Sequence, residues 1–144
     1  IENRILVKVN NEIITTIDIS NEISYLALFN KDILDLEKNA IIEIAKNNLI
    51  QNKIKRKEIL KYSDEIKINS DYLNKMIQNT YEQIGIKDLN NFIKLLEENN
   101  ISLKYIENKI ALNENWKQLV YLKYKDKIKI NKLKITKEVS NKKN

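Results

Sequence analysis

The sequence lacks the residues on which most enzyme active sites depend. Its 144 residues include no histidine, no cysteine and no proline, and Gly85 is the only glycine. Without histidine and cysteine, the commonest zinc sites, cysteine nucleophiles and histidine acid–base catalysts are excluded. The glycine-rich loops that bind nucleotide phosphates are excluded too, because they need several glycines at fixed spacing. We therefore expect a protein that is not an enzyme and that has no metal site and no cofactor.

The charge and the hydrophobic pattern restrict the possible partners. No hydrophobic run approaches the roughly 20 residues of a membrane-spanning helix, so we expect no transmembrane segment. The net charge is +6, which attracts anionic partners such as nucleic acid. The basic residues are distributed over every expected element, however, and only two are arginines. We therefore expect no specific nucleic-acid binding. The carboxylates are scattered at helix-surface spacing, which favours solvated faces.

The stretch "VNNEIITTIDI", residues 9–19, stands apart in a chain that otherwise reads as helix. The strand before it places alternate side chains on a face that we expect to meet the core: Ile5, Val7 and Val9. Asn10 and Asn11 predict a tight turn, since asparagine tolerates positive φ, and residues 12–15 would return as a second strand. Because a lone hairpin is marginal in water, other elements must cover or extend it.

Amphipathic helices are expected after the hairpin. Thr15 and Asp18 predict the first helix start, because a threonine hydroxyl caps free amides and an aspartate suits the positive end of the helix dipole. Further helix boundary signals stand at Asn69 or Ser70, at Gly85 and at Ser102. The expected helices cover residues 17–30, 36–62, 70–84, 88–99 and 103–124.

The pattern changes after Tyr124, where "DKIKINKLKIT" alternates lysine with isoleucine and leucine. A period of two predicts a strand over residues 127–135, which could join the hairpin as a third strand. The expected fold is therefore mainly α: about five amphipathic helices, a small N-terminal β-hairpin and this candidate C-terminal strand. No Gly/Ser or proline linker divides the chain, so we expect one domain over residues 1–139 and a basic disordered tail over residues 140–144.

The order of features in the opening stretch is strand end, turn, second strand and helix start. It is carried by Val9, Asn10, Asn11, Glu12, Ile13, Ile14, Thr15 and Asp18. This order, with the patterns over residues 68–77, 88–99 and 113–130, resembles the N-terminal domain of the SurA-type periplasmic chaperones. Those foldases often carry parvulin peptidyl-prolyl isomerase domains. The resemblance covers about residues 4–139.

The resemblance implies a non-enzymatic chaperone, a holdase for unfolded outer-membrane or secreted polypeptides in the periplasm. It also implies that a signal peptide has been removed before Ile1. Parvulin active sites contain histidines, and this chain has none, so we expect no prolyl isomerase activity. In relatives a C-terminal segment packs back on this domain. A surface left open without that segment could bind clients or a second copy, and a homodimer could form by strand or helix exchange.

Tyrosine and tryptophan suit a half-wet client-binding surface, because each has an apolar body and a polar tip. The residues that we expect to bind clients are Tyr25, Phe29, Tyr72, Met76, Tyr81, Tyr121 and Tyr124. The alternative for each of these residues is a structural position in the core or at its boundary. For Trp116, which is not among them, we favour such a structural position. Two other functions stay open, a basic helical nucleic-acid-binding module and the chaperone fragment of a larger peptidyl-prolyl isomerase.

Overall fold

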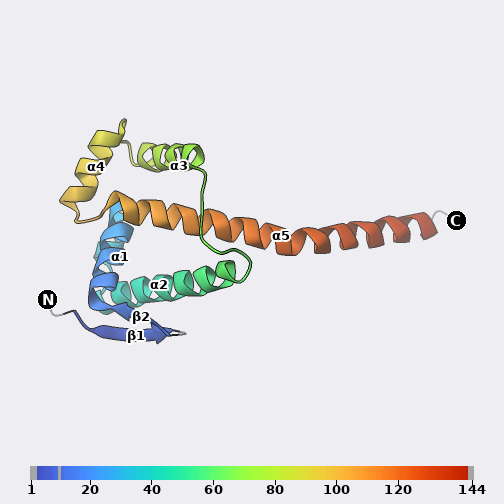
Figure 1. Cartoon of the computed structure of the whole chain (residues 1–144), viewed down its shortest axis with the longest axis horizontal. Coiled ribbons are helices and arrows are strands. Elements are labelled where there is room, and N and C mark those ends of the chain that lie inside the picture. The colour runs from blue at the N-terminus through green and yellow to red at the C-terminus, as the bar shows by residue number, and fades with distance from the viewer. Residues whose placement is uncertain (1–2, 10, 143–144) are drawn as a thin grey trace.

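The computed structural model describes residues 3–9 and 11–142, with side chains described except at 128–131 and 140–142, and it confirms a mainly helical fold with an N-terminal hairpin. The elements are β1 (Ile5–Val9), β2 (Glu12–Thr15), α1 (Thr16–Phe29), the 3-10 helix η1 (Lys31–Asp35), α2 (Lys38–Leu60), α3 (Ser70–Gln83), α4 (Leu89–Glu98) and α5 (Leu103–Lys142). As Figure 1 shows, α1, α2, α3 and α4 surround the first part of α5, and the rest of α5 extends away from them.

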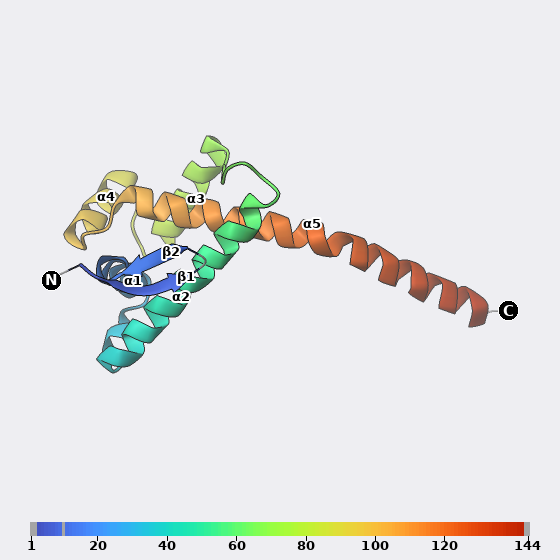
Figure 2. The same cartoon turned by 60° about the horizontal axis from the view of Figure 1, so that its bottom comes forward.

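The hairpin closes over the pair formed by α1 and α2 (Figure 2). Ile14 of β2 is buried against Ile19 of α1 and Ala45 of α2, and Val7 and Val9 pack on this cluster as expected. The hairpin is therefore part of the core structure.

One residue of the hairpin departs from the expected face. The register pairs Ile5 with Thr15 and Val7 with Ile14, so β1 has one extra residue between these pairs. An extra residue breaks the alternation of side chains, and the prediction that Ile5 faces the core is wrong, since its side chain is 60% exposed. In the predicted turn, Asn11 has a φ of 69°, and Asn10 lies outside the described residues.

Local signals set the helix boundaries. Thr15 and Asp18 form a capping box, in which each side chain accepts a hydrogen bond from the other residue's amide. Asn69 caps α3, and the Ser102 hydroxyl accepts a hydrogen bond from the third amide of α5, at Tyr105. Gly85, with a φ of 81°, follows the end of α3 as expected.

Two buried clusters form the core, and α1 contributes to both. The first contains Ile14, Ile19 and Ala45 beneath the hairpin. The second joins α3, α4 and α5: Ile77, Tyr81, Phe92, Leu96, Ile101 and Ile106. Tyr25, Leu28 and Phe29 of α1 pack on this second cluster, so α1 connects the hairpin side of the protein to the α3–α4 side.

The predicted third strand is wrong, because residues 127–135 lie within the 40-residue helix α5. Extending an existing helix adds one hydrogen bond per residue, and lysine is a good helix former. The chain between Ser102 and this segment contains no glycine or proline that would end the helix. The alternation of lysine and isoleucine therefore did not decide the conformation. The helix also includes residues 140–142 of the expected tail, and residues 143–144 lie outside the described part.

Candidate functional site

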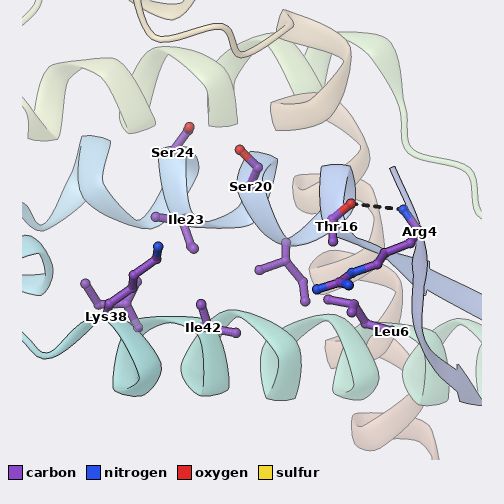
Figure 3. A pocket seen from close by; sticks show the side chains of 10 residues that line it. Arg4, Leu6, Thr16, Ser20, Ile23, Ser24, Lys38 and Ile42 are labelled. Carbon is purple, nitrogen blue, oxygen red and sulfur yellow. Dashed lines mark hydrogen bonds between the residues drawn. The ribbon is translucent and has the colours of Figure 1, made fainter. Parts of the chain in front are cut away.

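An apolar pocket of about 450 Å³ lies between β1, α1 and α2. Its lining residues are Arg4, Leu6, Thr16, Ile19, Ser20, Ile23, Ser24, Lys38, Ile41 and Ile42. In Figure 3, Ile23 and Ile42 lie between the two helices, with Lys38 at one end of the row and Arg4 with Leu6 at the other. The pocket therefore has aliphatic walls and a cationic side chain at each end.

The strand side of this pocket is held by two hydrogen bonds between Arg4 and Thr16. The Thr16 amide donates to the Arg4 carbonyl at 3.0 Å, and the Arg4 amide donates to the Thr16 hydroxyl at 3.1 Å. These bonds fasten β1 to the start of α1, where Leu6 stays 42% exposed at the pocket. Within the described residues β1 pairs with β2 alone, so its other edge is open to an extended peptide.

A second exposed apolar surface lies on the distal segment, which we define as residues 121–142 of α5. The ammonium of Lys123 lies 5.2 Å from the centroid of the Tyr62 ring, just beyond the end of α2. Past this point Figure 1 shows α5 extending without a neighbouring element in the described part of the chain. Among the described side chains of this segment, six large apolar ones are 49–66% exposed: Tyr121, Leu122, Tyr124, Leu133, Ile135 and Val139.

Four of the seven predicted client-binding residues keep accessible surface on α3 and α5. Tyr121 and Tyr124 are exposed on the distal segment. Tyr72 is exposed on α3, where its hydroxyl donates to Glu114 of α5 at 3.1 Å. Met76, one turn after Tyr72, is half-buried.

The other three lie in or against the second buried cluster. The rings of Tyr25 and Phe29 are 5.0 Å apart between centroids, and both side chains are half-buried. Tyr81 is buried beside Phe92. The seven residues are thus divided between the core, α3 and the distal segment, and they do not form one surface.

A buried ion pair connects α1 to α5. Glu22 is 1% exposed, although the sequence favours solvated faces for the carboxylates. Its carboxylate lies 2.6 Å from the ammonium of Lys109 and accepts a hydrogen bond from the Tyr105 hydroxyl. The same ammonium lies 4.4 Å from the centroid of the Tyr25 ring. The sequence prediction missed Glu22, whose only signal is its position three residues after the buried Ile19 and before the apolar Ile23.

Burial and the neighbouring Glu22 carboxylate also affect the phenols of this cluster. Burial, and secondly the charge of Glu22, raise the pKa of Tyr25 above its usual value. Burial raises the pKa of Tyr105 further, together with its hydrogen bond to Glu22. Both tyrosines are therefore held in the neutral form in the folded protein, where Tyr105 can donate its hydrogen bond.

The described residues offer no group of three or more acidic, histidine or cysteine side chains that could hold a metal ion. Among the described helices, none is long and apolar enough to cross a membrane. Comparison with known proteins finds no matching family model, no matching curated protein and no matching solved structure.

Proposed function

We propose that this chain is a non-enzymatic holdase domain of the SurA type, which binds unfolded outer-membrane or secreted polypeptides in the periplasm. The observation that carries the proposal is the apolar pocket between β1, α1 and α2. A holdase must offer an accessible concave apolar surface, and pockets of this size usually take a small ligand or a few side chains. The aliphatic walls of this pocket are suited to any large apolar side chain, which fits clients of unrelated sequence.

The backbone beside the pocket supports the same proposal. An extended client could place an apolar side chain between Leu6, Ile23 and Ile42 while its main chain runs along the open edge of β1. Main-chain hydrogen bonds give affinity without sequence selectivity, and the pocket adds a preference for apolar residues. Burying one such side chain contributes roughly 25 cal/mol per Å² of apolar surface, so binding of one segment would be weak and reversible.

The experiment that tests this proposal is suppression of client aggregation. An outer-membrane protein unfolded in urea is diluted into buffer with and without the chaperone, and light scattering is followed. We expect the wild-type protein to lower the scattering, and Leu6→Ser to require several-fold more protein for the same effect. The matched control is Ile13→Ser, because Ile13 is 43% exposed on the same hairpin and does not line the pocket.

Two results would count against the proposal. Wild-type protein in molar excess could leave the aggregation of several unrelated unfolded clients unchanged, in which case the holdase function fails. Alternatively, Ile13→Ser could weaken suppression as much as Leu6→Ser does. The binding surface would then be the exposed hairpin in general, and the pocket would have no specific part.

A further inference from the structure

The net charge of the protein is concentrated in one part of the chain. The distal segment, residues 121–142, contains eight lysines and two carboxylates, Asp126 and Glu138, which gives it a charge of +6. Residues 1–120 contain 17 basic and 18 acidic residues, which gives −1. Basic residues also occur in residues 1–120, but carboxylates balance their charge there, so a nearly neutral body carries one strongly basic segment.

The distal segment exposes apolar side chains along with this charge. Tyr124, Ile135 and Val139 follow Tyr121 by 3, 14 and 18 residues, and at 3.6 residues per turn the four share one face of α5. All four are exposed. Covering exposed apolar side chains removes their surface from water, so this helix gains stability from a partner that packs on the face.

We propose that the distal segment binds acidic segments of unfolded polypeptides that also contain aromatic or aliphatic side chains. This inference rests on the proposed holdase function and names the class of client that α5 selects. Charge complementarity carries it. A partner that neutralises +6 must be anionic, and a partner that covers Tyr121, Tyr124, Ile135 and Val139 must also be apolar.

The same observations disfavour other occupants of this surface. A second copy would bring two segments of +6 together, so dimerisation through this face is opposed by repulsion. A lipid surface favours an unbroken apolar face, but Lys125 and Lys132, 4 and 11 residues after Tyr121, interrupt this one. Nucleic acid would use the lysines but would leave the leucine, isoleucine and valine side chains without a role.

Ionic attraction between exposed groups predicts a strong dependence on salt. The Debye length is about 10 Å at 0.1 M salt and about 3 Å at 1 M, so added salt screens the lysines from the client's carboxylates. The apolar contacts do not weaken in the same way. Binding of acidic clients should therefore be fast and tight at low salt and should approach the affinity for neutral clients at high salt.

The test uses the full chain and three labelled peptides of equal length with the same tyrosine, leucine and valine positions. Their remaining positions are glutamate, serine or lysine, and binding is followed by fluorescence anisotropy. We expect the acidic peptide to bind at least about tenfold more tightly than the serine peptide at low salt, and this preference to disappear near 1 M salt. The lysine peptide should bind most weakly.

Two pairs of variants locate the preference. Lys125→Glu with Lys132→Glu should abolish the tenfold preference for the acidic peptide. Tyr121→Ser with Tyr124→Ser should weaken the binding of all three peptides to the same extent. The matched control, Lys75→Glu with Lys94→Glu, changes the net charge equally on exposed positions of α3 and α4 and should retain the preference.

Equal binding of the three peptides would overturn the inference, and so would loss of the preference in the control pair. Tighter binding to anionic lipid vesicles or to single-stranded DNA than to the acidic peptide would assign the segment to lipid or to nucleic acid instead. Aggregation suppression is measured in parallel on the same samples. If suppression persists while the peptide preference is absent, this inference fails and the proposed holdase function stands.

Discussion

Replacing Lys109 with methionine tests the buried ion pair between α1 and α5. In the wild-type protein the Lys109 ammonium lies 2.6 Å from Glu22, whose side chain is 1% exposed. Methionine keeps much of the apolar volume of lysine and removes the charge. The Tyr105 hydroxyl would remain as the hydrogen-bond donor to a carboxylate that water cannot reach.

The expected loss is large because one charge of a buried pair is left without its partner. Removing one member of such a pair costs about 3–5 kcal/mol, and the exposed pairs found on most surfaces contribute about 0–1 kcal/mol. For a chain of this size each kcal/mol lowers the melting temperature by roughly 2–5 °C, so we expect a decrease on the order of 10 °C.

The assay is urea unfolding followed by far-UV circular dichroism, with linear extrapolation to water. The matched control is Lys46→Met, because Lys46 lies at the same 2.6 Å from Glu43 but on an exposed helix face. We expect this control to lose less than about 1 kcal/mol. The double variant Glu22→Gln with Lys109→Met should recover most of the stability, because a neutral amide costs far less to bury than a carboxylate.

The result that would refute this reasoning is a Lys109→Met variant no less stable than Lys46→Met. Glu22 would then have found water or another donor, and the burial of its carboxylate would not hold in solution. A double variant that loses the sum of the two single losses would show that Glu22 and Lys109 do not interact energetically.

Three further predictions follow from the described contacts. Val7→Asp should cost several kcal/mol in urea unfolding, because Val7 packs half-buried on the cluster under the hairpin, and an unchanged midpoint would contradict that packing. Raising the pH above the usual tyrosine pKa of about 10 should destabilise the protein, because the unfolded state loses phenol protons that folded Tyr25 and Tyr105 retain. Below that pH the two phenols contribute their full stabilisation of the folded protein. Tyr25→Phe with Tyr105→Phe should make the loss of stability at alkaline pH less steep. An equally steep loss in the double variant would exclude these two phenols as its source. A protease-coupled assay on a proline peptide should match the uncatalysed rate, and an acceleration proportional to protein concentration would show isomerase activity.

Local sequence signals predicted most element boundaries, but the predicted end of α5 was wrong because the helix continues past Tyr124 to Lys142. The capping box of Thr15 and Asp18, the cap at Asn69 and the glycine at position 85 depend on hydrogen bonds and backbone conformations that span only a few residues. Such signals can be recognised without knowledge of the tertiary structure. The extra residue in β1 was not predictable in this way, because a bulge depends on how two strands pair.

The amino-acid sequence by itself determined the mainly helical fold, the hairpin and the helix boundaries at Thr15, Asn69, Gly85 and Ser102, since these follow from short-range hydrogen bonding and periodicity. Only the tertiary structure decided that Glu22 is buried against Lys109 and that Tyr81 lies in the core. It also decided that aliphatic side chains of β1, α1 and α2 form the pocket. These features depend on which helix faces meet across distances of many residues, and a residue's type and its neighbours in sequence do not specify that contact.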